Sequence, residues 1–190
     1  MKKIRFITAA LMLMLLILSS FVGDDTPEKN SLGKFFSVKG ITIFYMAEPI
    51  HEYEILGTIK GVEATHFGPQ AALSTAIEKF QKKGIEADAL LLKTEDMDVG
   101  TIIKFSDPEL SDDEKNIGKT SLVNNTYMFF KSNPIQEYEV ICEIKIGHPG
   151  NIGPGAMMHE LWMKMNRKCP EGEALILSTN LLRAEVVKFK

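Results

Sequence analysis

The stretch PIHEYEILGTIK, residues 49–60, decides the organisation of this chain, because it returns 85 residues later as PIQEYEVICEIK, residues 134–145. The match runs without a gap from residues 49–94 to residues 134–179, and 17 of these 46 aligned positions are identical. Chance would give about three identities, because a common amino acid makes up about 7% of an average protein. The sequence therefore predicts two copies of one structural unit.

Each copy has the pattern of four strands. In the first copy, residues 41–45 are β-branched and aromatic, and residues 52–60 alternate between apolar and polar side chains. Residues 89–92 form a continuous apolar run, which is typical of a central strand covered on both faces. Residues 101–105 give the last strand.

A helix separates the second strand from the third in each copy. Gly68-Pro69 opens the first helix, because proline suits the first turn of a helix, and Gly84 ends it. Its apolar residues recur at i, i+3, i+4 and i+7, and the same four positions are apolar in the second copy: Leu73, Ala76, Ile77 and Phe80, then Met158, Leu161, Trp162 and Met165. We expect both stripes to be buried against the sheets.

The predicted fold class is α/β, of the α+β kind, with two tandem β-β-α-β-β repeats that each form a small sheet covered by one helix. A unit of about 65 residues is marginally stable alone, so we expect the two copies to pack together. The predicted divisions are a signal peptide at 1–23, a flexible leader at 24–37, repeat 1 at 38–105, an acidic linker at 106–124 and repeat 2 at 125–190.

The first 23 residues have the features of a secretory signal peptide. Lys2, Lys3 and Arg5 precede an apolar run at residues 6–18, and small residues follow it. The run is shorter than the 20 or so residues of a spanning helix. We predict that the mature chain begins between Phe21 and Asp25 and is periplasmic or secreted. The alternative is an uncleaved anchor, the one route by which we expect this chain to contact a membrane.

Charge argues against nucleic acid as a partner. Removing residues 1–23 leaves 19 basic and 25 acidic residues, a net charge of −6. An acidic chain without a basic stripe is unsuited to nucleic acid or anionic lipid. We therefore expect a protein or a small ligand of the cell envelope as the partner.

Catalytic motifs are not recognisable in the sequence. None of the four histidines, His51, His66, His148 and His159, stands in a known hydrolase or zinc-protease pattern. The sequence also contains no nucleotide-binding fingerprint. We predict that the protein is not an enzyme and needs no cofactor.

Soft-metal binding is the sharper alternative. His159 and Met163 lie four residues apart on the second predicted helix, and Met157 precedes them. A thioether with an imidazole suits Cu(I). The competing interpretation, which we favour, is that these methionines fill an apolar face.

The two cysteines, Cys142 and Cys169, align with Gly57 and Gly84 of the first copy. Paired replacement of two glycines by two cysteines suggests that their backbones approach each other, and an exported chain enters an oxidising compartment. A disulfide and two buried free thiols are equally compatible with the sequence.

The first copy also carries a resemblance. The pattern LGTIKG at residues 56–61, then a helix, then GIEADAL at residues 84–90 resembles the YbjQ-type domains described as heavy-metal-binding. It is similar, too, to the periplasmic domain of the Rcs-pathway outer-membrane stress-sensor lipoprotein. The sensor's lipid-anchoring cysteine is absent here. The resemblance implies a small α+β fold in an envelope setting, and it gives no ground for assigning an activity.

The sequence as a whole thus favours an exported protein with a non-catalytic binding, structural or sensory role. Metal binding is the alternative.

Overall fold

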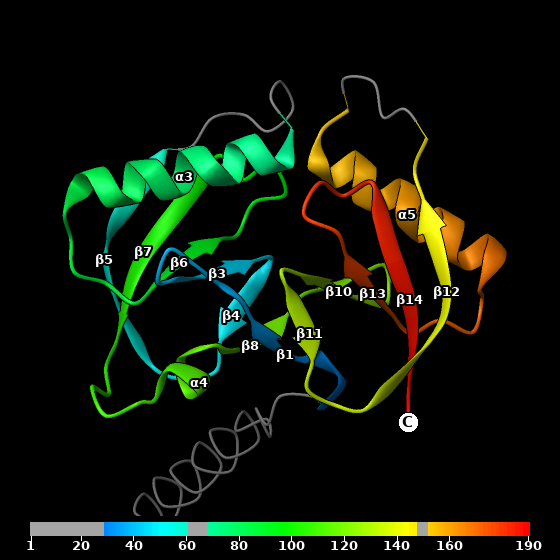
Figure 1. Ribbon diagram of the computed structural model, residues 1–190, viewed down its shortest axis with the longest axis horizontal. Coiled ribbons are helices and arrows are strands. Elements are labelled where there is room, and N and C mark those ends of the chain that lie inside the picture. Colours follow the sequence, from blue (N-terminus) through cyan, green and yellow to red (C-terminus); the bar gives the residue numbers. More distant parts are fainter. Residues whose placement is uncertain (1–28, 61–67, 148–151) are drawn as a thin grey trace, which may run out of the picture.

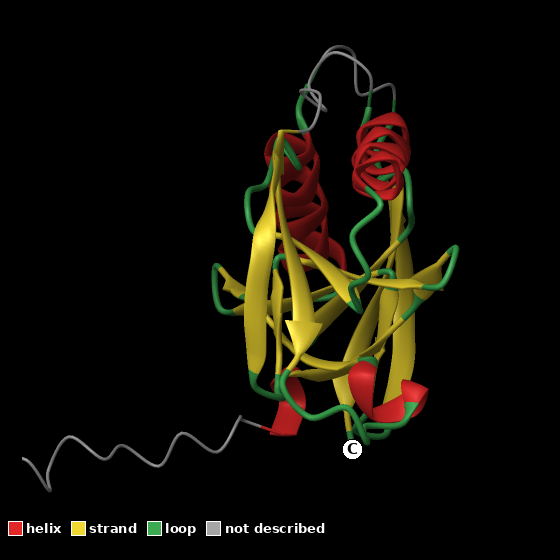
Figure 2. Cartoon of the chain, turned by 90° about the vertical axis from the view of Figure 1, so that its left-hand side faces the viewer, coloured by secondary structure: helices red, strands yellow, loops and turns green. Residues whose placement is uncertain are grey.

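The computed structural model describes residues 29–60, 68–147 and 152–190. Within these residues the fold is α+β, as the sequence predicts. Figure 1 shows two five-stranded sheets, each with one long helix, on either side of a smaller four-stranded sheet. Figure 2 shows from the side that the two long helices lie at one end of the molecule and the C-terminus lies at the other.

The first half of the molecule is built on a sheet with the strand order β2-β3-β6-β7-β5. Strands β3 and β6 are parallel, and the other neighbours are antiparallel. The elements of this half are β2 (Ser37–Val38), β3 (Ile41–Tyr45), β5 (Tyr53–Lys60), α3 (Pro69–Lys83), β6 (Ala89–Leu92) and β7 (Val99–Phe105).

The second half has the same elements in the same order, and its sheet runs β12-β14-β13-β10-β9. Its elements are β9 (Leu122–Val123), β10 (Thr126–Phe130), β12 (Tyr138–Lys145), α5 (Pro154–Lys168), β13 (Ala174–Leu177) and β14 (Arg183–Phe189). Both halves also have a bulge at the same place, in β5 and in β12. Whether the halves arose from one repeated unit remains a prediction.

One hydrophobic core joins the two halves. The helix-facing residues of both sheets and the apolar stripes of α3 and α5 belong to a single cluster of buried side chains. Tyr45 and Phe130, which are 85 residues apart, meet edge to face with ring centroids 4.7 Å apart. All four residues of β6 are buried, as predicted for a central strand. Because the core is shared, each half is stabilised by the other.

The small sheet between the halves has the order β11-β1-β8-β4 and takes strands from both. Its strands are β1 (Leu32–Phe35), β4 (Ala47–Pro49), β8 (Ile117–Thr120) and β11 (Ser132–Pro134). Gly33 lies opposite Gly118, and every pairing in this sheet is matched by a second pairing at positions 85 residues away. This register describes a pseudo-two-fold axis between β1 and β8.

The two central glycines are required by close packing. A Cβ atom on Gly33 would lie 3.0 Å from the ring of Phe129, and one on Gly118 would lie 2.6 Å from the ring of Phe44. Carbon atoms in contact normally lie about 3.5–4.0 Å apart. Glycine therefore allows one phenylalanine from each half to pack directly on the central backbone.

The predicted leader and linker need correction, because both contain ordered elements. Residues 29–37, assigned to the flexible leader, form a 3₁₀ turn η1 (Lys29–Ser31), all of β1 and the start of β2. Residues 106–124, assigned to the acidic linker, contain α4 (Asp112–Lys115), β8 and β9. Strands β1 and β8 are stabilised by pairing with distant segments, which a local sequence pattern does not reveal, whereas β2 and β9 pair with the strand that follows each of them. Residues 24–28 lie outside the described part of the chain.

Candidate functional site

Helix α5 carries the residues that the sequence singled out. It begins with Pro154 after Gly153, and its buried face contacts the sheet of the second half. Met158, Leu161 and Met165 are buried, as the apolar stripe predicts. Trp162 is a correction to that stripe, because the structure leaves it only partly buried. Its indole lies at the border between the core and the surface.

The predicted metal ligands are not brought together. Met157 is 3% exposed in the core, whereas Met163 is 46% exposed and His159 also lies on the surface. At about 100° per residue, Met157 is turned by about 160° from His159 and by about 120° from Met163 around the helix axis. The three-residue ligand set is therefore wrong. Within residues 29–60, 68–147 and 152–190, no group of three or more His, Cys, Asp or Glu side chains is placed to hold a metal ion.

A groove with a volume of 830 Å³ runs along the outer side of α5. Trp162 and Met163 supply its apolar surface, and the ring of His159 lies 5.3 Å from that of Trp162. The described residues that line the groove are Ile152, Ala156, Glu160, Trp162, Met163, Lys164, Asn166 and Arg167. A partly exposed tryptophan beside an exposed methionine is uncommon on a surface that contacts only water.

The polar side chains of the groove differ in whether a neighbouring group of the protein binds them. Lys164 lies 3.0 Å from Glu160 and donates a 2.7 Å hydrogen bond to the carbonyl of Lys145 on β12. Asn166 donates to the carbonyl of Trp162 one turn earlier. Arg167 makes no ion pair with any other described residue. Among the described residues of this groove, its guanidinium is therefore the charged group without an opposite charge beside it.

Helix α3 of the first half has no comparable apolar surface. The positions that correspond to Trp162, Met163 and Arg167 hold Ile77, Glu78 and Lys82. Ile77 is buried, and the other two are exposed charges. The groove is therefore a property of the second half. Replacement of Glu78 by Met163 is the sequence signal that pointed to this surface, although the sequence assigned it to a metal.

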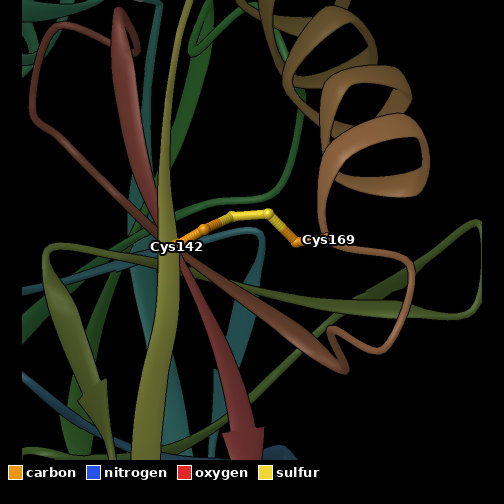
Figure 3. Close-up of a disulfide and its surroundings, with 2 residues drawn as sticks. All are labelled: Cys142 and Cys169. Carbon is orange, nitrogen blue, oxygen red and sulfur yellow. A yellow bond between two sulfur atoms is a disulfide. The ribbon is translucent and has the colours of Figure 1, made fainter.

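The second special feature of α5 is the disulfide between Cys142 and Cys169 (Figure 3). Cys142 lies on β12, Cys169 ends the helix, and their Cα atoms are 6.6 Å apart. This separation is within the range of protein disulfides, so the structure decides between the two alternatives that the sequence left open. At the corresponding place in the first half, the side chain of Lys83 on α3 donates a 2.8 Å hydrogen bond to the backbone carbonyl of Thr58.

The disulfide also bears on location. Disulfides persist in oxidising compartments and are rare in the cytosol of most organisms. Both cysteines of the chain are used in this one bond. The bond therefore fits a protein that works outside the cytosol.

One charged pair outside the groove fastens the segment between the halves. Lys115 of α4 lies 2.9 Å from Asp88, whose other oxygen accepts a 3.0 Å hydrogen bond from the backbone of Phe105. Burial disfavours the charged form of Asp88, but the hydrogen bonds from Lys115 and Phe105 outweigh it and lower the pKa of that carboxyl. The hydrogen bond to Asp88 raises the pKa of Lys115. The pair is thus held in its ionised form.

The two histidines within the described residues, His51 and His159, lie against different aromatic residues. The ring of His51 lies against Phe105, 6.4 Å away, and its Nε2 atom is buried without a hydrogen-bond partner among the described residues. His159 lies on the surface of α5. His66 and His148 lie outside the described residues.

Among the helices of the described chain, none has the length and apolar character needed to cross a bilayer. The signal-peptide prediction concerns residues 1–23, which lie outside the described chain. Comparison of this chain with protein-family models, with curated proteins and with solved structures finds no match.

Proposed function

We propose that this protein is exported to the cell envelope and acts there as a non-catalytic binding protein, with the α5 groove as its binding site. The observation that carries the proposal is the partly exposed Trp162 beside the exposed Met163 in a groove of 830 Å³. The disulfide and the basic-then-apolar N-terminus support the export part of the proposal.

The residue types of the groove are those that bind proteins. Tryptophan, methionine and arginine are enriched in the centres of protein interfaces, where a few side chains contribute most of the binding energy. Trp162 offers a large flat apolar surface, Met163 adapts its shape to a partner, and Arg167 has a charge available for a carboxylate. We therefore infer a partner that presents an apolar side chain next to an acidic group.

Soft-metal binding is the second candidate. His159 and Met163 are four residues apart and both exposed, so two ligands for Cu(I) remain after Met157 is excluded. Elemental analysis of the protein purified from the envelope tests this candidate. One copper per chain that disappears in His159→Ala would support it, and a metal-free protein would remove it.

The chain contains a single tryptophan, so its intrinsic fluorescence reports on the groove alone. We expect the emission of Trp162 to shift to shorter wavelength when the purified protein is titrated with a tryptophan-free peptide that carries an apolar side chain next to an aspartate, because a bound peptide would exclude water from the indole. The matched control carries Trp162→Phe and Glu78→Trp, which moves the reporter to the equivalent surface of α3. An equal shift in both proteins, or none in either, would refute the α5 groove as the site.

A further inference from the structure

The two halves differ in how the outer face of each sheet, the face turned away from the long helices, is covered. In the first half this face carries a cluster of buried apolar residues, including Leu91 and Phe105, and Leu110 from the segment 106–116 packs on it. Figure 1 shows α4, which belongs to this segment, beside the strands of the first half.

The same face of the second half is more open. Leu91 is fully buried and Phe105 is 4% exposed, but their counterparts Ile176 and Phe189 are only partly buried. The halves do not differ in this way on the neighbouring strand, where Val140 of β12 is 51% exposed and its counterpart Ile55 of β5 is 63% exposed. A depression of 300 Å³ lies on this sheet and is lined by Glu143, Ile176, Leu177, Ser178, Arg183, Ala184 and Glu185.

Within the described residues, the carboxylate of Glu173 at this face lacks the lysine that pairs with the corresponding carboxylate of the first half. Asp88 of the first half has Lys115 at 2.9 Å, in addition to the backbone of Phe105. Glu173 occupies the corresponding position in the second half and accepts the corresponding hydrogen bond, from the backbone of Phe189 at 2.8 Å. It has no lysine or arginine partner among the described residues.

We propose that the outer face of the second sheet binds a peptide segment of another protein that presents an apolar side chain and, five residues later, a lysine. The first half shows the chemistry, because its own segment supplies Leu110 to the apolar cluster and Lys115 to the carboxylate. The apolar side chain would cover Ile176 and Phe189, and the lysine would pair with Glu173. This site is separate from the α5 groove and does not depend on it.

A labelled peptide with the sequence of residues 107–116 tests the proposal against the full exported chain. Asp107, Glu109, Asp112 and Asp113 are replaced by serine in this peptide to reduce repulsion from the acidic protein. We expect saturable binding by fluorescence anisotropy. Glu173→Gln should weaken it about threefold, the size expected for a partly exposed ion pair. A peptide that also carries Leu110→Ser should bind at least about tenfold more weakly, because the apolar contact is lost.

The protein supplies its own controls. Ile176→Ser should weaken binding, whereas Ile55→Ser, at an exposed position of the first half, should leave it unchanged. The absence of saturable binding would overturn the proposal, as would equal effects of the two serine variants. Binding that appears only after deletion of residues 24–28 would also overturn it, because the chain's own leader would then be the occupant.

Discussion

Removal of the disulfide by the double substitution Cys142→Ala and Cys169→Ala should cost the protein a large part of its stability. The two cysteines are separated by 27 positions, so the bond closes a loop of about 28 residues. The chain-entropy model gives about 3.6 kcal/mol for such a loop at 25 °C. For a chain of this length, that loss corresponds to a fall in the melting temperature of roughly 7–14 °C.

Denaturant unfolding followed by the fluorescence of Trp162 measures the effect directly. The oxidised protein, the same protein with reductant, and the double variant are compared. We expect the last two to unfold together at a lower denaturant concentration, because each lacks the cross-link. Reductant should not change the double variant.

The first half offers a matched comparison. Lys83→Met removes the hydrogen bond to the carbonyl of Thr58, which lies where the disulfide lies in the second half. Loss of a single exposed hydrogen bond should cost about 1 kcal/mol or less. If the double cysteine variant were no less stable than the oxidised protein, the view that this bond fastens α5 to β12 would be refuted.

Three further predictions concern stability. Gly118→Ala should destabilise the protein by about 1–3 kcal/mol, because its Cβ would meet the ring of Phe44 at 2.6 Å, and an unchanged denaturation midpoint would contradict the packing of the central sheet. The Asp88→Asn variant should be less stable than the natural protein at pH values above about 4, the pKa of this carboxyl in the unfolded chain. The difference between their free energies of unfolding should shrink as the pH falls through the lowered pKa of Asp88 in the folded protein, and denaturant unfolding at a series of pH values measures it. Leu161→Ala should lower the stability by about 2–5 kcal/mol, because Leu161 is buried. Trp162→Ala should lower it by less than the value of about 3–5 kcal/mol that is typical of a buried tryptophan. A larger loss of stability from Trp162→Ala in thermal melts would show that its indole is buried.

The local patterns of the sequence predicted the main elements well. The helix stripes and the apolar run at residues 89–92 carry their own periodicity, so α3, α5 and β6 follow from neighbouring residues. Strands β1 and β8 were missed because each has four residues and a central glycine. Their stability comes from pairing across the two halves, and Gly118, which reads as a breaker, is instead a point of close approach.

The candidate site was predicted only in part. The sequence identified Met163 and His159 as unusual residues on the second helix, and the structure places both on the surface. It wrongly added Met157, because closeness in sequence does not mean a shared helix face. The partial exposure of Trp162 was not predictable, since the position belongs to the apolar stripe and only the three-dimensional packing shows where the stripe meets solvent.

The most direct test of the binding role is site-specific photo-crosslinking in the cell that produces the protein. A photoreactive phenylalanine analogue replaces Met163 in one variant and Glu78, the equivalent exposed residue of α3, in the other. The proposed function predicts a discrete crosslinked product from position 163 that is absent from position 78 and is lost when Arg167→Glu is added. Identical product patterns from both positions, or no product from position 163, would contradict it.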